Sequence, residues 1–213
     1  MNEAEISPDR LTELIARIKQ GDNDAAASVF IHFRPRLKKM IALRMDARLN
    51  GRVDPSDVLQ ETFFDYVNRA KDYSANEDMP FFLWVRMITG QKLLEIHRRH
   101  LKVQARDVSR EISYHGGVIA DASASHIAEQ LVGQLSSPSS AMRRLERQMQ
   151  LQKVLMNLSN TDREILGLRH FEELSNRDTA LLLGVNENAA SNRYVRALER
   201  LKAELSKVSG FFD

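Results

Sequence analysis

Apolar side chains recur at helical spacing along most of this chain, and this periodicity restricts its fold more than any other feature. Glycine and proline, with 9 and 5 residues among 213, are scarce, and the strict alternation that marks β-strands is hard to find. The sequence therefore predicts an all-α protein. A length of 213 residues suits one large or two small domains.

A change of composition divides the chain into two helical blocks. Residues 107–140 are rich in Ser, Ala and Gly and carry little charge, which is typical of a linker, with a short helix expected at 127–135. We therefore predict two small helical domains, residues 1–106 and 141–213, joined by a flexible linker.

Start and stop signals locate the helices of the first block. Apolar positions before Gly21 indicate one helix, and Pro35 leaves open whether the next apolar stretch is one helix or two. The motif DPSD at 54–57 begins another, because it offers an Asp as N-cap and a Pro at the first helical position. A further helix is expected from near Pro80 to beyond Arg99.

The second block is predicted to contain a helix at 142–158, followed by three further helices. Their expected capping residues are Thr161 with Glu164, Ser175 with Asp178, and Asn186.

The last of these helices follows a turn at Gly184, within LLLGVNENAASNRYVRALERL. On a helical wheel its buried arc contains Ala190, Tyr194, Ala197, Leu198, Leu201 and Leu205. Opposite lie Asn188, Asn192, Val195, Arg196 and Glu199, with Ala189, Arg193 and Arg200 along one flank. Asn can read an adenine edge, Arg a guanine edge or a phosphate, and small side chains allow deep entry into a groove. The pattern predicts a DNA-binding helix-turn-helix, and the alternative is the solvated face of an ordinary bundle.

The helix that begins at 54–57 has an acidic outer face. Opposite its core side lie Asp57, Glu61, Phe64 and Asn68, with Gln60 at the border. An acidic face is normally only solvated, but a large aromatic in its middle indicates an anchor for a basic partner helix.

Residues 71–102 combine aromatic and basic side chains. Tyr73, Phe81, Phe82 and Trp84 surround a polar loop, and Arg86, Lys92, Arg98 and Arg99 follow on a helix. Aromatics beside a basic track can stack unpaired bases while cations hold the backbone. The alternative is that the aromatics form core, and Trp84, Ile88 and Leu94 are expected to be at least partly buried.

Composition excludes several classes of protein. The chain has no cysteine, which rules out disulfides and thiolate metal sites. Its start, MNEAEISPDR, lacks the basic and apolar parts of a signal peptide, and no apolar run is long enough to cross a bilayer, so we expect a cytoplasmic protein without membrane contact. The net charge of +2 does not by itself indicate a nucleic-acid-binding protein. The distribution of charge is more informative, because basic residues gather at 97–106 and acidic residues at 54–65 and 172–178.

No catalytic constellation is found, and we expect neither an enzyme nor a cofactor. His97 and His100 have metal-ligand spacing but only Glu95 as a nearby carboxylate, so a metal site is not expected. The histidines show no nucleophile partner, and a Gly-rich phosphate loop is missing.

Taken together, three segments resemble the extracytoplasmic-function (ECF) class of the bacterial sigma-70 family. DPSDVLQETFFDYV resembles the core-polymerase-binding helix, and MPFFLWVRMITGQKLLEIHRRHL the promoter-melting and −10 recognition helix. LSNTDREILGLRHFEELSNRDTALLLGVNENAASNRYVRALERL resembles the −35-reading domain. The order and spacing of the three segments support the resemblance more strongly than any one of them, and they imply sigma2-like and sigma4-like domains.

The resemblance implies roles for three groups of residues. The β′ clamp helices of core RNA polymerase would bind Asp57, Gln60, Glu61 and Phe64. The −10 DNA, with a base flipped from the non-template strand, would bind Tyr73, Asn76, Phe81, Trp84, Arg86, Gln91, Lys92, Arg98 and Arg99. The −35 duplex would bind Asn188, Ser191, Asn192, Arg193, Arg196 and Arg200.

Further partners implied are the β flap of polymerase, promoter DNA and an inhibitory anti-sigma factor, with a monomer as the free state.

The sequence also departs from the family pattern. Ser191 stands where Arg or Lys is frequent, and Ala189 and Ala190 stand where Thr and Val are frequent. Thr179 replaces a common Ile and predicts looser packing, and Gly90 predicts a weak point in the −10 helix.

Two other functions compete with this interpretation. A helix-turn-helix regulator that acts without polymerase would explain residues 160–205 but leaves the acidic helix and the aromatic turn without a role. Such a regulator is also expected to form a dimer, and the sequence contains no long heptad repeat that would form the dimer interface. An all-helical adaptor would explain the acidic face but not the recognition helix.

Overall fold

The computed structural model describes residues 6–49, 51–75, 79–101, 112–113, 116–117 and 141–208. The fold is all-α, as predicted, apart from one short antiparallel pair of strands, β1 (Ile112–Ser113) and β2 (Gly116–Gly117). The helix expected at 127–135 lies outside the described residues. Within the described ranges, every helix is too short or too polar to cross a bilayer.

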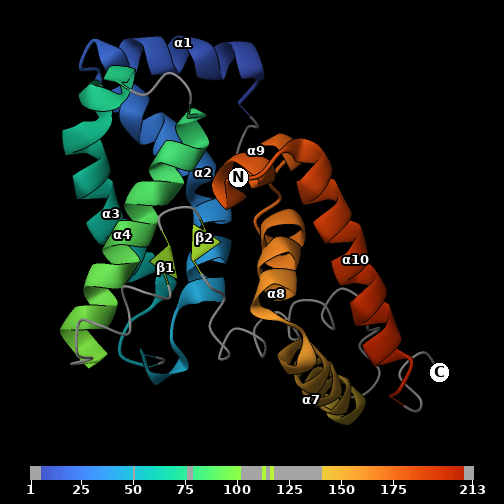
Figure 1. Ribbon diagram of the computed structural model, residues 1–213. Helices are drawn as coiled ribbons and strands as arrows, with labels where there is room; N and C mark the ends of the chain where they lie inside the picture. Colours follow the sequence, from blue (N-terminus) through green and yellow to red (C-terminus); the bar gives the residue numbers. More distant parts are fainter. Residues whose placement is uncertain are drawn as a thin grey trace.

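The N-terminal bundle consists of α1 (Pro8–Lys19), α2 (Asn23–Arg44), η1 (Ala47–Leu49), α3 (Pro55–Ala70), η2 (Lys71–Ala75) and α4 (Phe81–Leu101). Figure 1 shows α2, α3 and α4 side by side, with α1 crossing one end. Their shared core includes Val29, Phe33, Leu37, Leu59, Tyr66, Leu83 and Ile88. The buried Tyr66 hydroxyl donates to the carbonyl of Ala26 at 3.1 Å, which satisfies the one polar atom of that ring.

Local signals explain where these helices begin. Asp54 caps α3 by accepting from the Ser56 amide, and the Asp57 carboxylate accepts from the Asp54 amide in return. Pro35 lies inside one continuous α2. Proline removes a helical hydrogen bond, but Phe33 and Leu37 on either side are buried, and their packing keeps the helix intact.

The C-terminal bundle consists of α7 (Ala141–Asn157), α8 (Asn160–Leu166), the π-helix η3 (Gly167–Phe171), α9 (Asn176–Leu183) and α10 (Glu187–Leu205). Its core includes Leu151, Leu155, Leu158, Ile165, Leu166, Phe171 and Ala197.

The capping predictions for this bundle are confirmed at two helices and wrong at one. Ser175 accepts from the Asp178 amide and Asn186 from the Ala189 amide. Helix α8, however, is capped by Ser159 and not by Thr161 with Glu164. The serine lies one position before the helix begins, whereas Glu164 turns into the interior and pairs with Arg44 of the other bundle.

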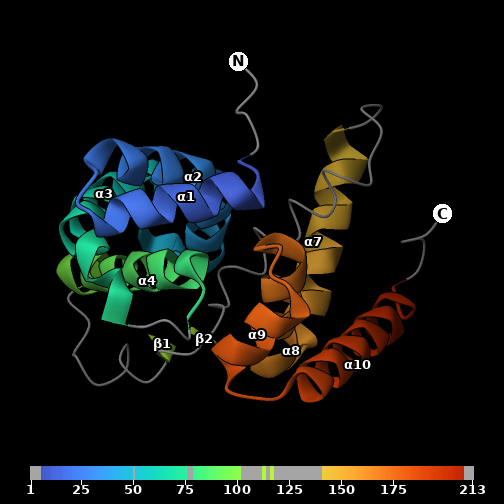
Figure 2. The same ribbon diagram turned by 90° about the horizontal axis from the view of Figure 1, so that it is seen from above.

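The two bundles pack directly against each other, and Figure 2 shows them side by side. Leu168, Leu174 and Leu182 from the C-terminal bundle join the N-terminal core, while Leu43 of α2 belongs to the C-terminal core. The two departures from the family pattern that predicted weak packing, Thr179 and Gly90, are both well accommodated. Thr179 is fully buried and its hydroxyl donates to the Ser175 carbonyl, and α4 continues through Gly90 beside Met40.

Candidate nucleic-acid interface

Helix α10 presents the predicted face to solvent. A left-handed glycine, Gly184 with φ 63°, ends α9, and Asn186 starts α10 two residues later. The side chains that face outward are Asn188, Ser191, Asn192, Arg193, Val195, Arg196, Glu199 and Arg200. Ala190 and Ala197 are fully buried against the bundle, which confirms the helical-wheel prediction. A short helix, a tight turn and a helix with a basic, amide-rich outer face are the components of a helix-turn-helix.

Arg200 differs from the other candidates on this helix because it has an internal partner. Its Nη1 donates to both carboxylate oxygens of Asp162, at 2.6 and 2.8 Å, and Asp162 is buried. This pair lines a cleft of about 320 Å³ between the end of α7, the start of α8 and α10. Arg200 therefore also stabilises the orientation of α10 on the bundle.

A contact that the sequence pattern did not reveal joins the middle of α10 to η3. The Tyr194 hydroxyl and His170 Nε2 are 2.8 Å apart, and the Arg169 guanidinium lies 5.4 Å from the Tyr194 ring centre. Burial, and then the Arg169 charge, lower the pKa of His170, so the neutral ring is favoured in this hydrogen bond. The aromatic residue was assigned to the buried arc, but nothing local identified its partners.

The acidic face of α3 carries one strongly exposed aromatic side chain. Phe64 is 69% exposed, and Gln60 beside it is exposed too. Asp57 is exposed while its carboxylate caps the helix. Glu61 is half-buried and pairs with Arg99 of α4, with an N–O distance of 3.3 Å. The four predicted polymerase contacts thus lie on one helix, and Phe64 has little packing within the chain.

The aromatic candidates of the −10 set are packed inside the N-terminal bundle. Phe81 and Trp84 are each 5% exposed, and their ring centres are 5.5 Å apart. Tyr73 is half-buried, touches both rings, and donates its hydroxyl to the Met79 carbonyl at 2.6 Å. Burial raises the pKa of Tyr73. Asn76 lies outside the described residues. In this arrangement, the aromatic rings near this turn function as core.

The polar candidates of α4 divide between exposed and buried positions. Gln91, Arg98 and Arg99 are exposed, and Gln91 accepts from Arg69 at 2.9 Å. Lys92 is 8% exposed, and its ammonium lies 2.8 Å from both Asp65 and Glu95, hydrogen bonds that raise its pKa.

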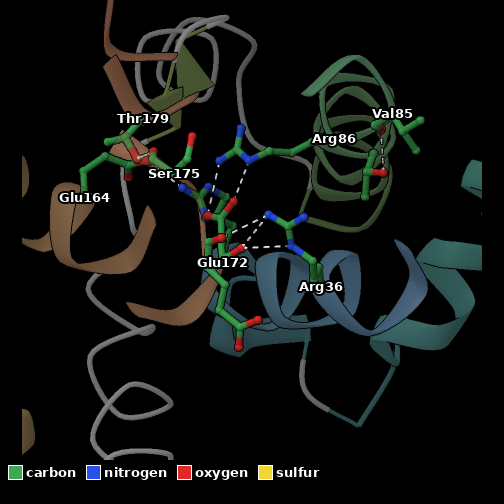
Figure 3. Close-up of polar contacts among 10 residues, drawn as sticks. Arg36, Val85, Arg86, Glu164, Glu172, Ser175 and Thr179 are labelled. Carbon is green, nitrogen blue, oxygen red and sulfur yellow. Dashed lines mark hydrogen bonds and ion pairs between the residues drawn. The ribbon is translucent and has the colours of Figure 1, made fainter. Parts of the chain in front are cut away.

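Arg86 is also buried, because it points toward the C-terminal bundle. Its guanidinium binds the carboxylate of Glu172, with Nε 2.5 Å from Oε2. Arg44 of α2 binds the other oxygen of Glu172 and also Glu164. Figure 3 shows Arg86 and Arg36 converging on Glu172 from the N-terminal bundle. The sequence shows a cluster of acidic residues at 172–178, but it does not indicate which arginines or lysines pair with them.

His97 and His100, which were predicted not to bind metal, differ in their exposure to solvent. His97 is buried, and its Nε2 accepts from the Asp46 amide at 3.3 Å, whereas His100 is exposed. Across the described part of the chain, His, Asp and Glu side chains form no cluster able to hold a metal ion.

Comparison with known proteins agrees with this geometry. Residues 148–201, which include α8, α9 and most of α10, match the family model of sigma-70, region 4. The fold is similar to that in the structure of CnrH in complex with the cytosolic domain of CnrY, with a TM-score of 0.54 and 20% sequence identity. The likeness covers 92% of this chain and 97% of that chain, and at this identity it concerns the fold alone. No match was found among curated proteins.

Proposed function

Because the chain belongs to the sigma-70 family and has the two-bundle helical fold expected of the ECF class, we propose that it binds core RNA polymerase and directs promoter-specific initiation. The observation that carries this proposal is the exposed face of α10 within the region 4 match, behind the Gly184 turn. The polymerase performs the chemistry of RNA synthesis, and this chain selects and opens the start site in the cytoplasm.

The −35 duplex is proposed to bind α10. Asn188, Asn192 and Arg196 are exposed and can make the paired hydrogen bonds that distinguish bases in the major groove. Ser191 and Arg193 flank them and suit phosphate contacts. Arg200 is exposed as well, but its Asp162 partner keeps it close to the bundle, so it suits the phosphate backbone better than a base.

The −10 element is proposed to bind α4 and the aromatic turn before it. Gln91, Arg98 and Arg99 are already exposed and can track a DNA backbone once Arg99 exchanges its carboxylate partners Glu61 and Glu95 for a phosphate. Arg86 and Lys92 join them only if their present carboxylate partners release them. The turn that includes Tyr73 and Asn76, with Phe81 and Trp84 behind it, is proposed to receive the flipped base, whose pocket offsets the few kcal/mol lost on unstacking.

Polymerase is proposed to bind at two places. The face with Asp57, Gln60, Glu61 and Phe64 docks on the β′ clamp helices, and the C-terminal bundle contacts the β flap. This division assigns residues 1–106 to a sigma2-like domain, 141–213 to a sigma4-like domain, and 107–140 to the linker. CnrH was solved with the cytosolic domain of CnrY, and we propose an anti-sigma partner for this chain as well.

In vitro transcription tests the proposal directly. Core polymerase, with and without this protein, is given a fragment library of the source genome, and transcript 5′ ends are mapped. We expect discrete new start sites that share −35 and −10 sequences. Absence of such sites, with the same core active on another sigma factor, together with absent binding to core polymerase, would favour the helix-turn-helix regulator instead.

Base reading by α10 has its own test. Asn192→Ala with Arg196→Ala is expected to weaken binding to the mapped promoter by about 2–6 kcal/mol, because each bidentate base contact contributes about 1–3 kcal/mol. Lys202→Ala is the matched control, since it removes an exposed cation from the last turn of the same helix. Promoter binding is measured with the polymerase holoenzyme at fixed salt. Equal losses in both variants, or an unchanged −35 preference, would contradict base reading by this face.

A further inference from the structure

Glu172 lies at the centre of a buried ionic cluster that joins the two bundles. Glu172 follows the π-helix η3 and is fully buried. Its carboxylate binds Arg44 of α2 and Arg86 of α4, both nearly buried, and Arg44 also binds Glu164 of α8 at 2.6 Å. Two arginines from the N-terminal bundle thus face two glutamates from the C-terminal bundle, and Figure 3 labels Arg86, Glu164 and Glu172 of this cluster.

A second layer of contacts surrounds this cluster at the same turn. Arg36 donates to the backbone carbonyls of Glu172 and Glu173 at 3.2 to 3.3 Å, while its guanidinium lies 3.7 Å from the ring centre of Phe82. Lys39 pairs with Glu173 at the solvent edge. Helix α2 therefore holds the turn through its backbone as well as through its charged side chains.

The backbone of this turn adopts a left-handed conformation that residues other than glycine rarely adopt. Glu173 has φ 56°, the one positive φ outside glycine among the described residues. The Glu172 amide donates to Gly167 across the π-helix, and the Leu174 amide donates to Leu168. Strained residues and π-helical turns persist when the surrounding structure holds them, and they concentrate at functional sites. Here the strained turn directs Glu172 into the opposite bundle.

The charges of the cluster depend on one another. Burial alone would raise the pKa of Glu172, but Arg44 and Arg86 together lower it, so this carboxylate stays ionised. Burial raises the pKa of Glu164, whose second carboxylate oxygen has no hydrogen-bond partner among the residues that the structure describes. Glu172 therefore provides the main counter-charge for both arginines, and without it two cations would remain buried with one weak partner.

We propose that Glu172 is an interdomain latch that closes the free protein and withholds Arg86 from promoter DNA. The role of Arg86 rests on the proposed function above, whereas the latch itself does not. In the closed form Arg86 is 6% exposed, and its Nε and Nη2 both donate to the carboxylate of Glu172, so the guanidinium cannot bind a phosphate. Binding to core polymerase separates the bundles and frees Arg86.

The closed form does not hide both predicted DNA surfaces equally. Asn188, Asn192 and Arg196 on α10 stay exposed while the latch is closed. The latch thus acts on the −10 side of the molecule, where strand opening is proposed, and leaves the −35 reading face open to solvent.

Energy transfer between two dyes on the full chain tests the latch without polymerase or DNA. The chain has no cysteine, so Arg34→Cys on α2 and Arg177→Cys on α9 supply two exposed labelling positions on opposite sides of the contact. We compare this labelled parent with the same protein carrying Glu172→Gln. Glu173→Gln is the matched control, because it removes the same charge from the next residue but breaks only the exposed pair with Lys39.

The parent is expected to show one high-transfer population, and Glu172→Gln is expected to shift the closed-to-open ratio at least tenfold toward low transfer. Glu173→Gln should behave like the parent, and core polymerase should convert the parent to low transfer. A natively folded Glu172→Gln variant with the parent's transfer would overturn the latch. If that variant fails to fold, the parent alone decides, since low transfer in the free parent would also overturn it. Transcription assays score the proposed function separately, so the two ideas can fail independently.

Discussion

Replacing Phe64 by alanine separates polymerase binding from folding more cleanly than any other change on α3. The side chain is 69% exposed, and a phenylalanine has about 200 Å² of surface to bury, so about 140 Å² is available to a partner. At about 25 cal/mol per Å², complete coverage would contribute about 3.5 kcal/mol, while a typical aromatic hot spot contributes at least about 2 kcal/mol. The dissociation constant for core polymerase should therefore rise by about 30-fold to 400-fold.

The stability of Phe64→Ala should change little, because the ring's one aromatic neighbour among the described residues is Phe63, with ring centres 6.4 Å apart. Ile31→Ala is the matched control, since Ile31 is also a large apolar side chain, 54% exposed, but belongs to a different helix, α2. Affinity is measured by fluorescence titration of labelled protein with core polymerase, and folding by circular dichroism. Unchanged affinity in Phe64→Ala, or an equal loss in Ile31→Ala, would refute the assignment of this face.

Three further predictions concern stability. Gly184→Ala should lower the free energy of unfolding by about 1–2 kcal/mol, because φ is 63° there, whereas Gly90→Ala in α4 should raise it by up to about 1 kcal/mol, since its new methyl would meet Met40 at an ordinary 3.5 Å. Urea denaturation checks both, and the same sign for the two variants would contradict the backbone argument. Burial lowers the pKa of His97 below its ordinary 6.5, so the folded state favours the neutral ring. The contribution of His97 to the free energy of unfolding should be complete above about pH 6.5 and should fall by at most about 1.4 kcal/mol per pH unit below it. His97→Gln should remove this contribution and so reduce the slope of stability against pH, to which His170 also contributes; an unchanged slope would contradict the assignment.

Much of the fold within each bundle could be predicted because it depends on local chemistry. The spacing of Ala190 and Ala197 identified the buried side of α10, and both are fully buried. Asp54, Ser175 and Asn186 were recognised as caps, because short polar side chains satisfy helix-start amides only from the position before the helix. Such signals act over a few residues, and the sequence displays them directly.

The contact between the bundles could not be predicted, because its partners lie far apart in the chain. Glu164 has the right spacing from Thr161 for a capping box, yet it binds Arg44 instead. Arg86 was assigned to DNA from its place on a basic helix, and a long-range carboxylate occupies it in this structure. Periodicity marked Trp84 as at least partly buried but could not separate aromatic rings of the core from rings that stack on nucleobases.

The ionic character of the bundle contact is suited to a closure that must be reversible. Leu168, Leu174 and Leu182 supply apolar contact, but the centre of the interface is occupied by Arg44, Arg86 and their glutamates. Buried ion pairs contribute little net stability, because their mutual attraction largely offsets the hydration lost on burial. When the bundles separate, the charged groups regain that hydration, so opening costs less than exposing an equal area of hydrocarbon. The same charges require close geometric matching, which allows Glu172 to select one closed arrangement while leaving it within reach of a partner's binding energy.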